Sequence, residues 1–363
     1  MKMRKLCYLL GALALSISAA SAQQRVVHVY NWSDYVDAKL IDEFTRETGI
    51  KVIYDTYDSN ETLEAKLLAG RSGYDLVAPS GTFLQRQIQS GLYRPLDRSK
   101  LSNAKHLWPE VDARLAVYDP GNQHAVNYMW FTTGIAYDVA KAKTRIGDQP
   151  LNTWDILFKP DLLRKFADCG VYVLDSPEDL FAIALRYLKL NPDSKVPGDI
   201  AKASALLQRI RPSVRRFHSS EYINGLANGD ICLAVAWSGD SFQAKNRARE
   251  AGNGIEIGYV IPREGTLMSM DNFAIPKDAV NVEEAYAFID FLLRPENAAR
   301  NTTASNFANG VLAAASMILP EIIQNKAIYP DDEVMSRLFT VSPPDRQTQR
   351  TITREWTRIK TGR

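Results

Sequence analysis

Short apolar runs and amphipathic helical patterns alternate over the first hundred residues. The runs at 26–30, 51–54 and 74–78 are rich in β-branched and aromatic residues, and each predicts a strand. Between and after them, apolar positions recur every three or four residues, and glycines at 49, 70 and 91 mark the ends of three predicted helices. This alternation predicts a parallel, doubly wound sheet with helices on both faces.

A second series of elements follows an extended aromatic segment at 127–137. It comprises predicted helices at 154–158, 177–190, up to 210, 220–228 and 283–293, and strand-like runs at 169–174, 214–217, 231–237 and 258–262. We interpret the chain as an α/β protein with two lobes, each a mainly parallel sheet flanked by helices. The expected division assigns 23–130 and 259–308 to lobe 1 and 131–258 and 309–363 to lobe 2, with at least two hinge crossovers.

The amino terminus carries the three parts of a secretory signal peptide. Residues 1–5 are basic, residues 6–15 are apolar, and small residues lead to Ala20-Ser21-Ala22. The apolar part is shorter than the roughly 20 residues that span a bilayer. We therefore expect residues 1–22 to be removed on export to the periplasm, with cleavage after Ala22.

Removal of residues 1–22 changes the charge of the chain. That segment carries three positive charges and no acid, so the formal net charge falls from +2 to −1. A nearly neutral chain lacks the basic field that would hold nucleic acid or an anionic membrane. The length of the chain exceeds what one core usually organises, which favours two domains.

The sequence contains no recognisable catalytic or metal-binding motif. The patterns of the nucleophile elbow, the zinc proteases, the phosphate loop and the dinucleotide fold are all missing. The four histidines (His28, His106, His124 and His218) are scattered, and each fits a packed or surface position better than a base or a ligand. We expect no enzymatic activity, no metal and no cofactor. A secreted hydrolase, whose nucleophile and base meet only in space, is the alternative from another functional class.

Two cysteines follow residue 22. Cys169 and Cys232 lie in separate strand-like runs. An even pair in an oxidising compartment favours one disulfide, and two separate buried thiols are the other interpretation. Two distant cysteines fit no metal site.

Aromatic and acidic residues meet where two predicted strands end. Trp32-Ser33-Asp34-Tyr35 follows the first strand, and Trp237-Ser238-Gly239-Asp240 follows the strand that contains Cys232. Ligands of open parallel sheets gather at the carboxyl ends of the strands. The two corners fall in different lobes and can therefore face each other across a cleft.

This combination of residues suits an organic cation. Aromatic faces attract ammonium groups and cover a methylene chain, and carboxylates form strong charge-assisted hydrogen bonds. Another interpretation assigns Asp34 and Asp240 to helix caps, and Trp32 and Trp237 to the core. The matching corners on two lobes favour a binding site. An amino acid is a different class of solute, and it would need a cation in the cleft for its carboxylate.

The sequence resembles a known family at these residues. The segments 27–35, 73–80, 237–240, 261–265 and 271–276 are similar to segments of the periplasmic putrescine- and spermidine-binding proteins of polyamine ABC importers. The likeness covers essentially the whole chain from residue 26 onward and is greater to the putrescine-binding branch. It implies a type II binding-protein fold whose two lobes close on a ligand. We expect a monomer that docks on the membrane permease of an ABC importer.

The resemblance also implies a set of ligand-binding residues. These are Trp32, Ser33, Asp34, Tyr35, Ser80, Asp179, Trp237, Asp240, Ser269, Asp271 and Phe307, with Cys169 and Cys232 paired as a disulfide. Asp179 stands where the branch has a glutamate and is expected to act through water. Ser269 stands where the family has an aromatic ring, and Phe307 where it has a tyrosine. Putrescine is the expected ligand. The missing ring leaves room for agmatine, cadaverine or spermidine, unless Met268 or Met270 refills it.

Overall fold

The computed structural model describes residues 24–362, so the predicted signal peptide and its cleavage site lie outside the described residues. The chain begins with strands and helices in alternation, as the apolar pattern predicts. The elements are β1 (Val26–Trp32), α1 (Ala38–Thr48), β2 (Lys51–Tyr57), α2 (Asn60–Leu68), β3 (Leu76–Val77), α3 (Gly81–Gln89) and α4 (Pro109–Leu115).

The chain then crosses to the other half of the molecule on one long strand and later returns on another. The outward part comprises β4 (Ala125–Asp138), α5 (Val139–Ile146), α6 (Asp155–Phe158), α7 (Pro160–Leu163), β5 (Val171–Val173), α8 (Pro177–Tyr187), α9 (Pro197–Ile210), β6 (Arg216–Phe217), α10 (Glu221–Ala227), β7 (Leu233–Trp237), α11 (Ser238–Ala251) and β8 (Ile257–Val260). The return comprises β9 (Met268–Ala274), α12 (Val282–Leu292), α13 (Pro295–Ser305), β10 (Ala308–Asn309), α14 (Pro320–Ile323), α15 (Asp332–Met335) and α16 (Arg346–Thr361).

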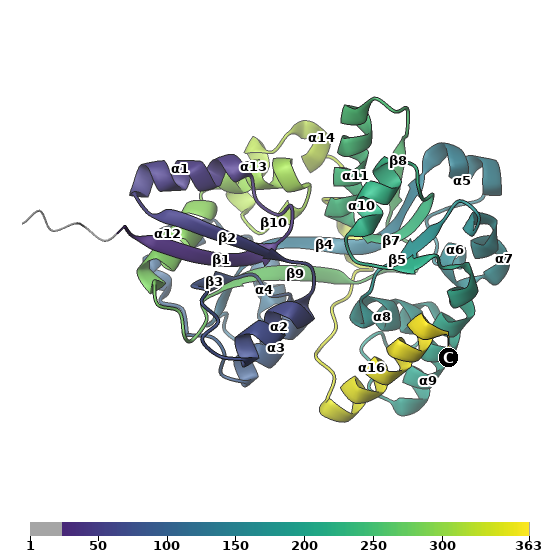
Figure 1. Ribbon diagram of the computed structural model, residues 1–363, viewed down its shortest axis with the longest axis horizontal. Helices are drawn as coiled ribbons and strands as arrows, with labels where there is room; N and C mark the ends of the chain where they lie inside the picture. The colour runs from purple at the N-terminus through teal and green to yellow at the C-terminus, as the bar shows by residue number, and fades with distance from the viewer. Residues whose placement is uncertain (1–23, 363) are drawn as a thin grey trace, which may run out of the picture.

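One sheet runs through both halves (Figure 1), in the order β2-β1-β3-β9-β4-β7-β5-β6, with β8 and β10 paired to β4. Strand β1 is parallel to β2 and β3, and β5 is parallel to β6 and β7. Strand β4 joins the halves: residues 125–132 lie within its antiparallel pairing with β9, and residues 133–137 pair with β7. The structure therefore has the predicted two lobes, built from sheets flanked by helices and joined by hinge crossovers.

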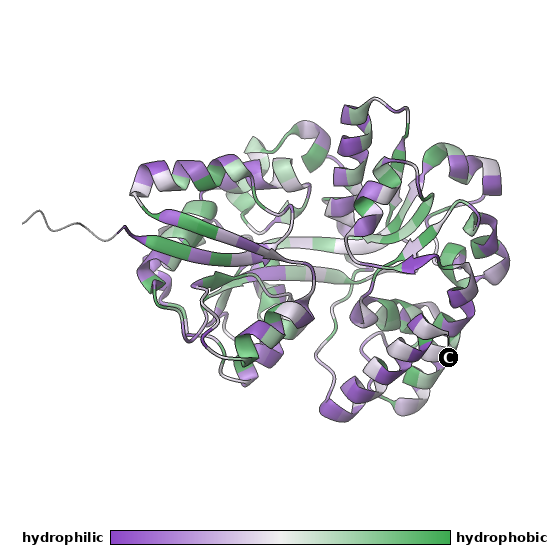
Figure 2. Ribbon diagram, in the orientation of Figure 1, coloured by the Kyte–Doolittle hydropathy of each residue, from purple (hydrophilic) through white to green (hydrophobic). Residues whose placement is uncertain are grey.

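Two hydrophobic cores lie on either side of the point where β4 changes partner. Val29 of β1, Phe44 of α1 and Phe288 of α12 are fully buried in the first core. Trp154 and Phe166 are fully buried in the second. Figure 2 shows hydrophobic stretches in the outer part of β1 and in the strands of the second half, and many hydrophilic residues along the outer helices α1 and α16.

The carboxyl-terminal part of the chain contributes to both cores. Val311, Ile318 and Leu338 pack in the first core, whereas Trp356 and Ile359 of α16 pack in the second. The division expected from the sequence, with all of 309–363 in lobe 2, stays a prediction. The packing of the segment around 311–338 favours its assignment to lobe 1.

Several element boundaries differ from those expected. The strand predicted at 74–78 forms a ladder only over Leu76–Val77. Gly73, with a φ of +82°, and Pro79, which has no amide hydrogen, limit this ladder at its two ends. The strand predicted at 214–217 is reduced to Arg216–Phe217, and the helix predicted to 190 ends at Tyr187.

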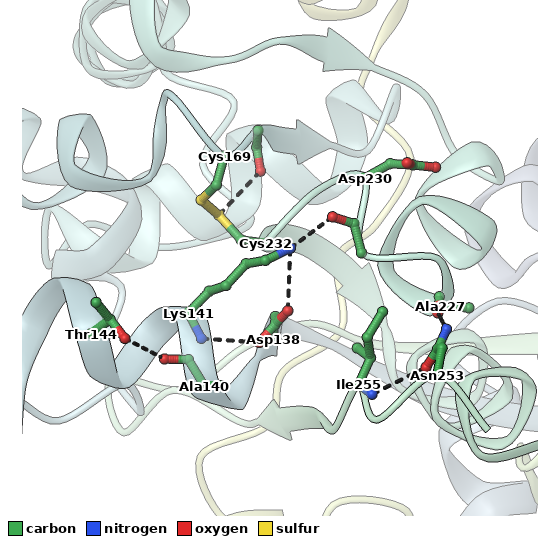
Figure 3. Close-up of polar contacts among 12 residues, drawn as sticks. Asp138, Ala140, Lys141, Thr144, Cys169, Ala227, Asp230, Cys232, Asn253 and Ile255 are labelled. Carbon is green, nitrogen blue, oxygen red and sulfur yellow. Dashed lines mark hydrogen bonds and ion pairs between the residues drawn. A yellow bond between two sulfur atoms is a disulfide. The ribbon is translucent and has the colours of Figure 1, made fainter. Parts of the chain in front are cut away.

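A disulfide ties together the segments that lead into β5 and β7. Cys169 and Cys232 are 63 residues apart in the sequence and their Cα atoms are 5.7 Å apart. Figure 3 shows the bond, with Asp138 and Lys141 nearby. The amide of Asp138 donates to the carbonyl of Cys232 at 3.0 Å, so the disulfide is continuous with the hydrogen-bonded edge of β4. The pairing agrees with the prediction.

We expect removal of this disulfide to destabilise the protein without changing its ligand affinity. In the chain-entropy model, closing a loop of this length stabilises the fold by about 4 kcal/mol, and measured values are typically about 2–4 kcal/mol. The double variant Cys169→Ser/Cys232→Ser should lose that amount of unfolding free energy in urea titrations. Reduction of the unmodified protein should give the same loss. Equal denaturation midpoints with and without the bond would contradict the prediction.

Candidate ligand-binding site

A cavity of about 100 Å³ lies between the two lobes, where the carboxyl ends of β1, β3 and β7 meet. It is lined by all of the residues predicted from the sequence: Trp32, Ser33, Asp34, Tyr35, Ser80, Asp179, Trp237, Asp240, Ser269, Asp271 and Phe307. The structure thus brings the two aromatic and acidic corners together. Their role in binding stays a prediction.

Asp271 of β9 is the acid held most firmly by lobe 1. Its side chain is buried, and its two oxygens accept hydrogen bonds from the hydroxyl groups of Ser80, at 2.6 Å, and Tyr35, at 2.8 Å. The amide group of Asn60 donates to the Ser80 hydroxyl at 2.9 Å and so orients it. Burial raises the pKa of Asp271 to about 7, although both hydrogen bonds act to lower it.

Asp240, in the first turn of α11, is its counterpart in the second lobe. It is also buried, and its Oδ2 accepts a hydrogen bond from the hydroxyl of Tyr222 at 2.5 Å. Burial raises the pKa of Asp240 to about 7 as well. Each lobe therefore presents to the cavity a carboxylate whose ionised form is disfavoured by its surroundings.

Two further acids lie side by side at the start of α8. Asp179 accepts hydrogen bonds from the hydroxyl groups of Ser176, at 2.5 Å, and Thr133, and from the indole nitrogen of Trp237 at 3.4 Å. Glu178 accepts one from Thr82 at 2.6 Å, and burial raises its pKa to about 7. Burial also raises the pKa of Asp179. In the described part of the chain, no three His, Cys, Asp or Glu side chains are arranged to hold a metal ion.

Aromatic rings from both lobes form the rest of the wall. The rings of Trp32 and Trp237 meet edge to face with 6.2 Å between their centroids, and Phe131 lies 5.7 Å from Trp237. Phe307 packs edge to face against Tyr35 at 4.7 Å. The cavity wall thus combines aromatic rings with carboxylates.

Comparison with known proteins identifies the family of this chain. Residues 39–330 match the family model of the bacterial extracellular solute-binding proteins. The chain belongs to this family. It is a solute-binding protein and not an enzyme, and no helix within residues 24–362 has the length and apolar character of a membrane span.

Individual relatives in the family cover nearly the whole chain. The solute-binding protein is 50% identical to the putrescine-binding periplasmic protein SpuD of Pseudomonas aeruginosa, over 95% of this chain and 94% of the relative. It is 47% identical to the putrescine-binding periplasmic protein PotF of Escherichia coli, over 97% and 96% of the two chains. Among solved structures, the spermidine/putrescine transporter substrate-binding protein PotD from Streptococcus pneumoniae matches with a TM-score of 0.77 at 29% identity, covering 93% of this chain and 99% of that chain. The predicted type II fold is confirmed.

The capping interpretation of the two aspartates is wrong for this solute-binding protein. Helix α1 is capped by Asp37, whereas Asp34 lies in a turn with a φ of +54° and forms an ion pair with Arg247 at 2.9 Å. Helix α11 begins at Ser238 without a side-chain cap, and Asp240 points instead to Tyr222. The tryptophans at 32 and 237 are only partly buried, so they are not simple core residues.

The alternative in which Met268 or Met270 fills the place beside Ser269 is also wrong. Ser269 and Asp271 alternate with Met268 and Met270 along β9, and only the first two line the cavity. Both methionines are buried in the first core on the opposite face of the strand. Ser269 therefore contributes only a small polar side chain to the cavity wall.

Several lining residues were not predicted from the sequence. Tyr57 and Phe131 supply rings, and Asn60 orients Ser80. Glu178, beside Asp179, supplies a further acid. The signal that could have found three of them is position: Tyr57 ends β2, and Asn60 and Glu178 lie in the first turns of the helices α2 and α8. Phe131 lies inside the long hinge strand β4.

Polar contacts hold the lobes of the solute-binding protein together around the cavity. One of them is the ion pair between Asp34 and Arg247. In addition, the side-chain amide nitrogen of Gln243 on α11 donates to the backbone carbonyl groups of Asp34, at 3.2 Å, and Ser305, at 3.0 Å. The hydroxyl of Thr82 on α3 reaches Glu178 of α8. The structure is therefore a closed arrangement of the lobes.

Close packing at Gly239 leads to a prediction about closure. A Cβ atom at Gly239 would lie 2.2 Å from Cδ2 of Phe307, and so Gly239→Ala should hold the lobes apart. Overpacking of this kind costs about 1–3 kcal/mol, so we expect the affinity for the ligand to fall by about 5- to 150-fold in calorimetry. Gly198→Ala, where a Cβ atom meets nothing within 4 Å, is the matched control. Unchanged affinity in Gly239→Ala, or no recovery when Phe307→Ala is added, would contradict this account.

Proposed function

We propose that the chain captures a linear diamine, with putrescine as the first candidate, for an ABC importer. One observation carries the proposal. Eight acids line the cavity and, among the described lining residues, none is Lys, Arg or His. The acids are Asp34, Asp58, Glu61, Asp175, Glu178, Asp179, Asp240 and Asp271. Such a cavity is electrostatically unfavourable until a cation enters it.

The arrangement of the acids supports a ligand with a charge at each end. Asp271 of lobe 1 would accept one ammonium group, and Asp240 and Asp179 of lobe 2 would accept the other. The donors that already bond to these carboxylates are hydroxyl groups and an indole, which are neutral and leave the negative charge available. The rings between them would cover the methylene groups.

The same lining argues against an amino acid as ligand. A ligand carboxylate would meet several protein carboxylates and no described cationic side chain of the lining. Agmatine, cadaverine and spermidine remain alternatives, because the cavity wall at 269 carries only the small side chain of Ser269. They share the chemistry of putrescine, so the choice among them is one of length and shape.

The names of the relatives also support a proposal about where the protein acts in the cell. SpuD and PotF are periplasmic binding proteins. We infer that this chain is likewise exported to the periplasm, cut after Ala22, monomeric, and docked on a membrane permease when its lobes close. Mass spectrometry of the periplasmic fraction would detect a mature chain that begins at Gln23.

A ligand screen tests the proposed function directly. The mature protein is heated with putrescine, cadaverine, agmatine, spermidine or glutamate, and the melting temperature is recorded. Binding to the folded state raises the melting temperature, by an amount equivalent to about 2.7 kcal/mol at a hundred times the dissociation constant. We expect putrescine to give a saturable rise confirmed by calorimetry. The proposal would be disproved if glutamate alone raised the melting temperature, or if none of the amines raised it.

A further inference from the structure

Tyr222 of α10 lies behind the cavity wall and is in contact with an acid of the site. Its side chain is fully buried, and it is not among the described residues that line the cavity. Its hydroxyl lies 2.5 Å from Oδ2 of Asp240. The same hydroxyl oxygen accepts a hydrogen bond from the backbone amide of Trp237 at 3.3 Å. Since an amide can only donate, the hydroxyl proton is left to point at Asp240.

The carboxylate of Asp240 is subject to opposing influences from four elements. Burial raises its pKa, and the acids Asp34, in the turn after β1, and Asp271, on β9, raise it further. The hydrogen bond from Tyr222 on α10 and the charge of Arg247 on α11 lower it. Burial also raises the pKa of Tyr222 itself well above its ordinary value, so its hydroxyl stays a donor at physiological pH.

We propose that Tyr222 is a positioning residue for ligand capture, whose hydroxyl fixes Oδ2 of Asp240 so that Oδ1 faces an ammonium group. The inference rests on the proposed function, because it gives Asp240 an amine to bind. Without the Tyr222 hydroxyl, the side chain of Asp240 would be free to rotate. Its carboxyl group would also stay protonated more readily, and a protonated acid cannot form an ion pair with an ammonium group. The tyrosine thus acts through the acid and does not touch the ligand.

The other lobe repeats this arrangement. Tyr35 donates to Asp271 at 2.8 Å, and its own carbonyl accepts a hydrogen bond from Tyr128 at 2.5 Å. Each of the two acids is therefore held by a buried phenol. The pairs differ in one useful respect, because Tyr35 lines the cavity and Tyr222 does not. Tyr222 can be changed without altering the surface that the ligand meets.

The test is the pH profile of putrescine binding in Tyr222→Phe, measured by calorimetry from pH 5.5 to 8.5. Loss of a hydrogen bond to a charged group should move the midpoint of the profile up by about one pH unit. We expect affinity about fivefold weaker at pH 7 and about tenfold weaker at pH 6, with the difference shrinking toward pH 8.5. Tyr93→Phe is the matched control, because Tyr93 is also buried but donates to Gln87, at 2.6 Å, and neither residue is among those that line the cavity.

Two further variants separate positioning from simple structural support. Tyr222→Phe added to Asp240→Asn should have no additional effect, and p-aminophenylalanine at 222, which restores an N–H donor, should recover the profile even if Tyr222→Phe folds poorly. An affinity loss of the same factor at every pH, no loss at all, or full additivity with Asp240→Asn would overturn the inference. A failed proposed function looks different, because the unmodified protein would then bind no amine at any pH.

Discussion

Asp271→Asn is expected to weaken putrescine binding by about 30-fold or more at pH 8. Removing one partner of a buried, hydrogen-bonded charge pair costs about 2–5 kcal/mol, because the ligand ammonium is then desolvated without a counter-charge. Asparagine keeps the size of the side chain and can still accept from Ser80, which lies 2.6 Å from Asp271. The loss should therefore be specific to charge, and calorimetry of the purified mature protein measures it.

A second acid of the lining provides the control. Asp58 also lines the cavity, but its side chain is exposed to solvent. Asp58→Asn makes the same change of charge and should cost at most about 1 kcal/mol, as is usual for exposed pairs. The unliganded Asp271→Asn protein should melt no lower than the unmodified protein at pH 8, because a disfavoured buried charge has been removed. Equal affinities in Asp271→Asn and Asp58→Asn would remove Asp271 from the site.

The affinity for putrescine is expected to fall steeply as the pH is lowered below about 7. Asp240 and Asp271 have pKa values of about 7 in the unliganded protein because they are buried. A bound ammonium group requires their ionised forms, so each protonated acid must first lose its proton. This costs about tenfold in affinity per pH unit for each group below its pKa. We expect calorimetry to show binding about 10- to 100-fold weaker at pH 6 than at pH 8, with proton release on binding.

The stability of the unliganded protein should respond to pH in the opposite direction. The folded-state pKa of each acid is raised above the ordinary value of 3.8, so the folded state binds more protons than the unfolded state between about pH 4 and 7. The stabilisation by these two protonated acids is therefore complete below about pH 4 and is lost as the pH rises through 7. Melting temperatures of free and putrescine-saturated protein should diverge between pH 6 and 8. A constant difference between the two curves would show that these acids do not change ionisation on binding.

Much of the site could be predicted from the sequence because many of its residues lie at the ends of strands. The corners that begin at Trp32 and Trp237 could be recognised from their place after apolar runs, without knowledge of the pairing of strands. The same reasoning applied to β9 would have placed Met268 and Met270 in the core, because side chains alternate along a strand.

Other parts of the structure could not be predicted from local pattern. Tyr222 and Asp240 are 18 residues apart, on different helices, and only the packing of α10 against α11 brings them together. The helix α16 carries a helical signal in Ile352, Trp356 and Ile359, but its core contacts depend on where the chain returns after the first core. Both features depend on how distant elements pack in three dimensions, which the local pattern of one sequence does not indicate.

The meeting of two indoles across the cavity gives this protein an optical property of its own. Trp32 extends from the lobe of β1 and Trp237 from the lobe of β7, so their 6.2 Å separation exists only while the two lobes are together. Indoles this close couple electronically, and their separation would change both the near-ultraviolet circular dichroism and the emission of the protein. Each round of ligand capture would then be visible in real time without any attached dye. A stopped-flow spectrometer could follow the closure of the lobes through the change in tryptophan emission.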